Sequence, residues 1–159
     1  MSLESEWLDL LVDTLVASTT WVSACSPLSA TDRLIVGDGT GDQYGNLVLI
    51  DGSKVAIAPP WCIVTFAAAS NPRRSLGMWG ASVTAWIDLM LPAKLTGETP
   101  QEAYLRAVAD VTGIKSDLLQ AMATDSPIAT ELSIPEPVVA WDSPAATGWA
   151  ARIIATATH

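Results

Sequence analysis

Few residues of this 159-residue chain have the types and spacing that catalysis requires. The single histidine is His159, so a Ser-His-Asp or Cys-His relay would have its base at a frayed chain end. The two cysteines, Cys25 and Cys62, form neither a CxxC pair nor a disulfide framework, and each is interpreted as a small buried hydrophobe. We therefore expect no catalytic residue, and the sequence favours binding or assembly over an enzyme.

The segment 37–46 resembles two kinds of ligand-binding loop without completing either. Four of its polar residues fall near the odd positions of a calcium loop: Asp38, Thr40, Asp42 and Asn46. However, Gln43 stands where that loop needs glycine, and Leu49 stands where it needs the bidentate glutamate. Its glycines also lack the Gly-Lys-Ser/Thr ending of a phosphate loop and the spacing of a dinucleotide fingerprint. We expect a flexible Gly-rich loop, with no metal and no cofactor.

Charged pairs offer two further candidates. Glu98 and Glu102, like Asp9 and Asp13, lie four residues apart and could pair two carboxylates, although solvated helix faces account for this spacing. The adjacent Arg73 and Arg74 are the densest positive charge in the chain. They could dock on an acidic partner subunit, or they could form only a solvated turn.

The overall composition limits the possible partners. Eight Lys and Arg against 17 Asp and Glu give a net charge of −9, which argues against tight binding to a phosphate backbone. An acidic surface serves solubility, and it also lets a duplex pass close by without sticking. No apolar stretch reaches the roughly 18–20 residues that span a bilayer, and the start is acidic where a secretory signal is basic. We expect a soluble protein made in the cytosol, with no membrane partner.

The elements that would position these residues begin with an amphipathic helix over residues 3–24, which carries Trp7, Leu11 and Leu15 on one side. The short segments 47–50 and 54–58 flank Asp51-Gly52-Ser53 and predict a small hairpin.

A longer hairpin is predicted from the segments Trp61–Ala69 and Met78–Leu91, joined by a polar turn over residues 70–75. Its second arm alternates, and the face that should pack on helices holds Trp79, Ala81, Val83, Ala85, Ile87, Leu89 and Leu91. The other face is mixed and includes Met78, Trp86 and Met90. Such a face suits a subunit interface, and a second packed layer explains it equally well.

Helix signals return at Thr99-Pro100-Gln101-Glu102, which reads as a capping box. We expect this helix to end at Gly113 and a second short helix to follow over Lys115–Ala123. Segment Glu131–Trp141 contains Pro135 and Pro137, which predicts an edge strand, and Trp149–Thr158 predicts a last strand after the turn Asp142-Ser143-Pro144. The sequence thus predicts one α+β domain over residues 1–159, with a mixed, mostly antiparallel sheet, a long β-hairpin and two to three flanking helices.

The chain has seven tryptophans, and half of its residues are hydrophobic, so apolar surface is left over for partners and we expect an oligomer. Most of the tryptophans individually suit the core: Trp7, Trp21, Trp61, Trp79, Trp86, Trp141 and Trp149.

The order of these elements resembles the tail terminator proteins of long-tailed bacteriophages, also called tail completion or head-to-tail joining proteins. The resemblance lies in an amino-terminal helix, a Gly-rich region, the long hairpin Trp61–Leu91, the helix opened by Thr99–Leu105 and the final strand Trp149–Ile154. It implies a mixed sheet flanked by helices and a hexameric ring of identical subunits. The ring would cap the tail tube, meet the neck proteins below the head and let DNA pass. The chain would then belong to the virion tail or neck, after assembly in the host cytoplasm. The resemblance carries no residue motif, so it assigns no site residue.

Two other interpretations stay open from the residues. The chain could be another neck or minor tail protein, such as a head-completion or stopper protein. It could also be a monomeric binding module or small enzyme that uses loop 37–46 as a lid. The candidate interface of the leading interpretation consists of Arg73, Arg74, Met78, Trp86 and Met90.

Overall fold

The computed structural model describes residues 3–36, 47–48, 54–55, 58–70, 82–126, 128–142 and 147–158. Within them the chain has three helices: α1 (Leu3–Ala17), α2 (Thr19–Cys25) and α3 (Pro100–Asp125). The strands are β1 (Leu34–Val36), β2 (Leu47–Val48), β3 (Lys54–Val55), β4 (Trp61–Ser70), β5 (Ser82–Pro92), β6 (Ala129–Ser133), β7 (Val139–Asp142) and β8 (Thr147–Thr158). The predicted α+β class with a mixed, mostly antiparallel sheet and up to three helices is confirmed.

Six strands form the main sheet in the order β1-β4-β5-β8-β6, with β7 also paired to β8. Among the described strands of this sheet, only β1 and β4 form a parallel pair. The segments predicted as hairpin arms, β4 and β5, pair antiparallel with Trp61 opposite Met90. Of the turn predicted at 70–75, Ser70 is the last residue of β4, and the rest lies outside the described residues, as do the first four residues of the predicted second arm, 78–81. β2 and β3 pair antiparallel as predicted, and their turn at 51–53 also lies outside the described part of the chain.

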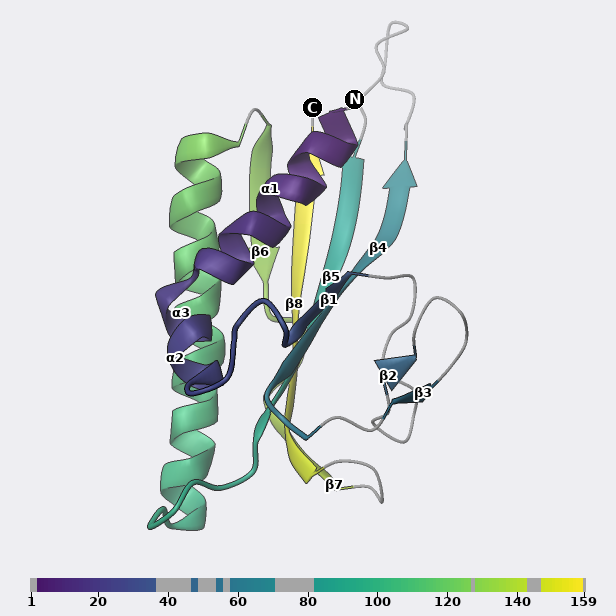
Figure 1. Cartoon of the computed structure of the whole chain (residues 1–159). Coiled ribbons are helices and arrows are strands. Elements are labelled where there is room, and N and C mark those ends of the chain that lie inside the picture. The colour runs from purple at the N-terminus through teal and green to yellow at the C-terminus, as the bar shows by residue number, and fades with distance from the viewer. Residues whose placement is uncertain are drawn as a thin grey trace, which may run out of the picture.

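All three helices cover one face of the main sheet, and the small β2–β3 sheet lies away from them, on the right in Figure 1. The alternation predicted for the second arm is confirmed, because the side chains that face the helices are buried from Val83 to Leu91. They pack in one core with Trp7, Leu11 and Leu15 of α1 and with Ile114 and Leu118 of α3. We call the sheet surface that points away from the helices the open face.

The amino-terminal helix is divided, where one helix over 3–24 was predicted. Ser18 separates α1 from α2, and the two helices meet at a bend of 56°. The Ser18 hydroxyl accepts a hydrogen bond from the Trp21 backbone N–H at 3.2 Å and donates one to Asp117 at 2.7 Å, so it caps α2. Among the described residues no single helix is long and apolar enough to cross a bilayer, and α1 and α2 pass that test only as a bent pair.

The prediction that Gly113 ends a helix is wrong, because α3 runs without a break from Pro100 to Asp125. A Cβ added to Gly113 would lie 2.8 Å from both Cγ2 and Oγ1 of Thr20. The glycine therefore allows α2 to approach α3 closely, and it does not stop the helix.

The carboxyl-terminal strands follow the edge prediction. The segment 131–141 contains most of two short strands, β6 and β7, on either side of Pro135 and Pro137, and both pair with the same strand, β8. β8 begins at Thr147, two residues earlier than predicted, and lies inside the sheet between β5 and these edge strands. Asp142, the first residue of the turn predicted at 142–144, is the last residue of β7. The other two residues of that turn lie outside the described residues, as does the segment 37–46.

A candidate interface on the open face

The open face of the sheet is formed by alternate residues of its three long strands. On β5 these residues are Ser82, Thr84, Trp86, Asp88 and Met90; on β8 they are Ala150, Arg152, Ile154, Thr156 and Thr158; on β4 they are Trp61, Ile63 and Thr65. This face has two tryptophans: Trp61 is buried, and Trp86 is partly exposed, with Thr65 and Ile154 directly opposite it on the neighbouring strands. No helix of the described residues covers this surface (Figure 1).

Trp86, Asp88 and Arg152 form the centre of the open face. Arg152 donates from Nε to Asp88 Oδ1 at 2.6 Å and from Nη2 to Oδ2 at 3.0 Å. Its guanidinium also lies 4.1 Å from the centroid of the Trp86 ring. The hydrogen bond that Arg152 donates to Asp88 raises the pKa of Arg152, so the guanidinium stays protonated.

This pairing comes from strand register. Asp88 on β5 lies directly opposite Arg152 on β8, and each is the single charged residue of its strand. Opposite charges placed across a strand pair attract each other, and an Arg held in a bidentate pair keeps one orientation. The result is a flat, rigid array of one tryptophan and one arginine, the two residue types that are most enriched at the energetic centres of protein interfaces.

Met90 lies at one end of the open face and is only 3% exposed. It packs with Trp61 and Ile63 in a second, smaller cluster, against which Trp141 and Ala150 also pack. This end of the mixed face is therefore buried within the chain, so Met90 offers little surface to a partner. Of the predicted interface residues, Trp86 remains partly exposed, and Arg73, Arg74 and Met78 lie outside the described residues.

Three buried polar groups lie in or beside the second cluster: the indole N–H groups of Trp61 and Trp141 and the hydroxyl of Thr65. Within the described part of the chain they have no hydrogen-bond partner. All three residues belong to the open-face side of the sheet. Buried polar groups usually have partners, so this end of the face departs from the ordinary pattern.

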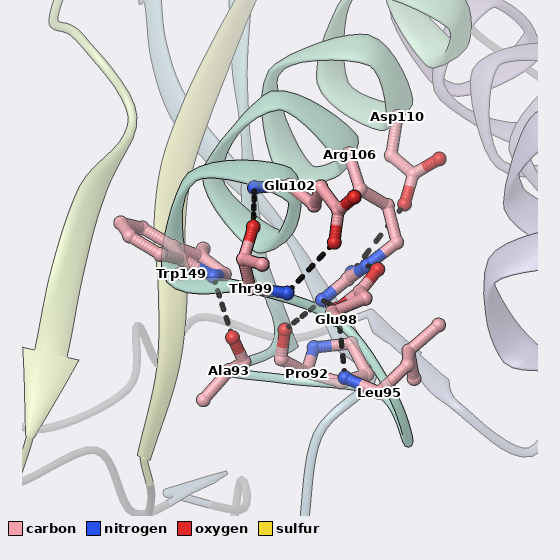
Figure 2. Close-up of polar contacts among 9 residues, drawn as sticks. All are labelled: Pro92, Ala93, Leu95, Glu98, Thr99, Glu102, Arg106, Asp110 and Trp149. Carbon is pink, nitrogen blue, oxygen red and sulfur yellow. Dashed lines mark hydrogen bonds and ion pairs between the residues drawn. The ribbon is translucent and has the colours of Figure 1, made fainter.

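A polar cluster at the start of α3 joins this helix to the end of β5 (Figure 2). Arg106 donates to both carboxylate oxygens of Glu98, at 2.7 and 3.2 Å, and to the Pro92 carbonyl at 2.8 Å. The predicted capping box is confirmed, since Glu102 N donates to Thr99 Oγ1 at 3.2 Å and Thr99 N donates to Glu102 Oε2 at 2.7 Å.

This cluster also shows how one of the two possible carboxylate pairs, Glu98 and Glu102, is arranged. Glu98 precedes α3, and the hydrogen bond from Arg106 lowers the pKa of its carboxyl group. Glu98 and Glu102 thus bind different partners and do not form the carboxylate pair that their spacing allowed. Asp9 and Asp13 are exposed on α1, in agreement with a solvated helix face.

A groove of about 540 Å³ separates α1 from the last turns of α3. Its lining includes Asp13, Thr14, Ser18, Asp117, Gln120 and Asp125. The Asp117 carboxylate accepts from the Ser18 hydroxyl at 2.7 Å and from the Thr20 backbone N–H at 3.2 Å, which fixes α3 to the start of α2. These hydrogen bonds, led by the one from Ser18, lower the pKa of Asp117.

Both cysteines are free and buried, as predicted. Burial raises the pKa of Cys25 to about 11 and that of Cys62 well above its ordinary value, so both thiols stay protonated at neutral pH. The described residues hold no group of three or more His, Cys, Asp or Glu side chains that could bind a metal ion.

Sequence reasoning named Trp86 but missed Arg152 and Asp88. The signal was present, because each is a lone charge in the middle of a long apolar or small-residue strand. What the sequence did not give was the register that places the two charges opposite each other. No protein-family model matches the chain, and no curated protein matches its sequence.

Proposed function

We propose that this chain is a structural subunit of a phage virion, similar to the tail terminators, which forms a ring on the tail tube and joins it to the neck. In this role it binds copies of itself, the tube protein and a neck protein, lets DNA pass without specific binding, and catalyses no reaction.

The observation that carries the proposal is the partly exposed Trp86–Asp88–Arg152 array at the centre of the open face. The helices all lie on the other side of the sheet, and although the β4 residues of the open face are buried, the array on β5 and β8 remains partly exposed. The array supplies that surface with a preorganised aromatic and an oriented arginine, which lose little conformational freedom on binding. Its charges already neutralise each other, which limits the desolvation cost of covering them.

Two further features support a ring. The two edges of the main sheet differ, because β1 and β4 form one and β6 and β7 form the other. Contacts between two different surfaces of one protein are heterologous, and such contacts close into rings when the rotation between neighbours allows it. The net charge of −9 would keep DNA from adhering to the protein as it passes.

The experiment compares two variants that each remove a partly exposed aromatic side chain. Trp86→Ala removes the centre of the open face, and Tyr104→Ala, on α3, serves as the matched control. Native mass by light scattering and negative-stain images are recorded for each variant, alone and with tail tubes. We expect rings or capped tubes with the wild-type chain and with Tyr104→Ala, and loss of both with a folded Trp86→Ala variant.

A wild-type chain that stays monomeric and leaves tube ends uncapped at high concentration would refute the proposal. If both variants assemble as well as the wild-type chain, the ring is still supported, but the open face is not part of its subunit contacts.

A further inference from the structure

The outer face of α3 has an unusual composition for a surface helix. Opposite its buried residues, a stripe runs along the helix that we call the α3 stripe: Gln101, Leu105, Ala109, Thr112, Ser116, Leu119 and Ala123, all of which are exposed. None of these seven residues is charged, although the chain carries 25 charged side chains in total. The charged residues of α3 lie beside the stripe or towards the core.

Two large apolar side chains stand out on this stripe. Leu105 is 54% exposed and Leu119 is 46% exposed. They lie fourteen residues apart, so about 21 Å of helix separates them on nearly the same line. Between them, the stripe has only the small side chains of Ala109, Thr112 and Ser116, which would allow another helix to approach closely.

The spacing is symmetric about Thr112, which lies seven residues from each leucine. If a second copy of α3 crosses antiparallel at this point, a twofold axis passes beside Thr112. Leu105 of each copy then meets Leu119 of the other, and the small residues of both copies face each other. A twofold contact of this kind uses the same patch on both subunits, which is what a self-complementary pattern provides.

Charge also favours a second copy as the occupant. Two chains that each carry a net charge of −9 repel each other over most of their surfaces, and α1 exposes Glu6, Asp9 and Asp13. The α3 stripe is a helix face of the described residues on which two copies can meet without opposing carboxylates.

We infer that the α3 stripe is a second self-association surface, on which two copies of this chain pack their α3 helices antiparallel across a twofold axis at Thr112. This contact is separate from the ring proposed above and does not depend on it, because it uses the helix layer and leaves the open face free.

Cysteine cross-linking tests the axis directly. Packed helices lie about 8–10 Å apart and have Cα radii of about 2.3 Å, so the two Thr112 Cα atoms would lie roughly 3.5–5.5 Å apart. This range overlaps the Cα separation of about 4.4–6.8 Å in disulfides. Because Cys25 and Cys62 are buried, an introduced cysteine is the reactive thiol of the folded chain.

The matched control is Gln101→Cys, at the end of the same stripe. In the antiparallel pair residue 101 faces residue 123 of the other copy, so it meets no second thiol. We expect Thr112→Cys to form a disulfide-linked dimer under mild oxidation and Gln101→Cys to remain largely unlinked. Cross-linking of both variants would indicate parallel packing, and cross-linking of neither would indicate no contact; either result overturns the inference.

Charged residues in place of the two leucines provide an independent test in solution. Leu105→Glu with Leu119→Glu places like charges at both ends of the contact and should shift the native mass from the dimer to the monomer, or from paired to single rings. Leu105→Lys with Leu119→Glu places opposite charges together only in the antiparallel arrangement and should retain the dimer. Equal behaviour of the two folded double variants would overturn the inference. The outcome is distinct from a failed ring, because Trp86→Ala leaves this contact intact.

Discussion

Gly113 in the middle of α3 provides a prediction whose sign depends on the tertiary structure. Replacing a glycine by alanine inside a helix ordinarily stabilises it by about 1 kcal/mol, because alanine has the higher helix propensity. Here the new Cβ would lie 2.8 Å from both Cγ2 and Oγ1 of Thr20 and 3.3 Å from its Cβ. Overpacking of this kind costs about 1–3 kcal/mol. We therefore expect Gly113→Ala to destabilise the protein by up to about 2 kcal/mol after the propensity gain is subtracted.

A double-mutant cycle with Thr20→Ala isolates the steric part. Thr20→Ala removes the two atoms at 2.8 Å and leaves the one at 3.3 Å. In that background Gly113→Ala should become neutral or stabilising, which gives a coupling free energy of about 1–3 kcal/mol between the two sites. The side-chain hydrogen bond of Thr20 to Asp117 cancels, because it is lost in both proteins that carry Thr20→Ala, and the hydrogen bond from the Thr20 backbone N–H is kept in all four proteins.

The assay is urea unfolding of the four proteins, with the free energy of unfolding compared at constant m-value. Ser116→Ala, at an exposed position of the same helix, controls for helix propensity and should gain a few tenths of a kcal/mol. If Gly113→Ala stabilises the otherwise unchanged protein by about 1 kcal/mol, the close approach of α2 and α3 is not real.

Two other predictions concern single side chains. Asp117→Asn should weaken the cap of α2 by about 1 kcal/mol at neutral pH, after allowance for solvent screening. The folded-state pKa of Asp117 is lowered, so its contribution is present above the unfolded-state pKa of about 3.9 and is lost as pH falls through the lower folded value. Chemical unfolding at pH 7 and below pH 4 should show the difference between the two proteins shrink, and a difference that is the same at both pH values would contradict the role of the carboxylate. Gly148→Ala should destabilise by about 3 kcal/mol or more, because its Cβ would collide with the Leu91 carbonyl oxygen, a backbone atom that cannot turn away. Thermal melts of this variant and of Thr147→Ala, its exposed neighbour, test that expectation, and an equal melting temperature for the two would disprove it.

Much of the fold follows from local patterns. The alternation along β5 identified the core-facing side of the sheet, because side chains of a strand point to opposite faces in turn. The Thr99–Glu102 capping box fixed the start of α3, and the two prolines placed β6 and β7 at an edge. Each of these signals depends on residues that are close together in the chain.

The candidate site was less accessible to sequence reasoning. Trp86 was named from the mixed face of its strand, whereas Met90, named for the same reason, is buried in the second cluster. The alternation says which face a residue occupies but not whether another segment covers that face. Burial on the open face depends on side chains from β4 and β7, which are distant in sequence.

The sequence by itself determined the fold class, the two faces of β5 and the start of α3 at its capping box. Only the tertiary structure decided that Gly113 lies inside a helix, that Ser18 divides the first one, and that Asp88 pairs with Arg152. All three depend on contacts between residues more than 60 positions apart, namely Thr20 with Gly113, Ser18 with Asp117, and Asp88 with Arg152. Local propensity disfavours glycine inside a helix by about 1 kcal/mol and does not by itself decide whether a serine continues a helix or caps the next one, so the tertiary contacts decide both cases.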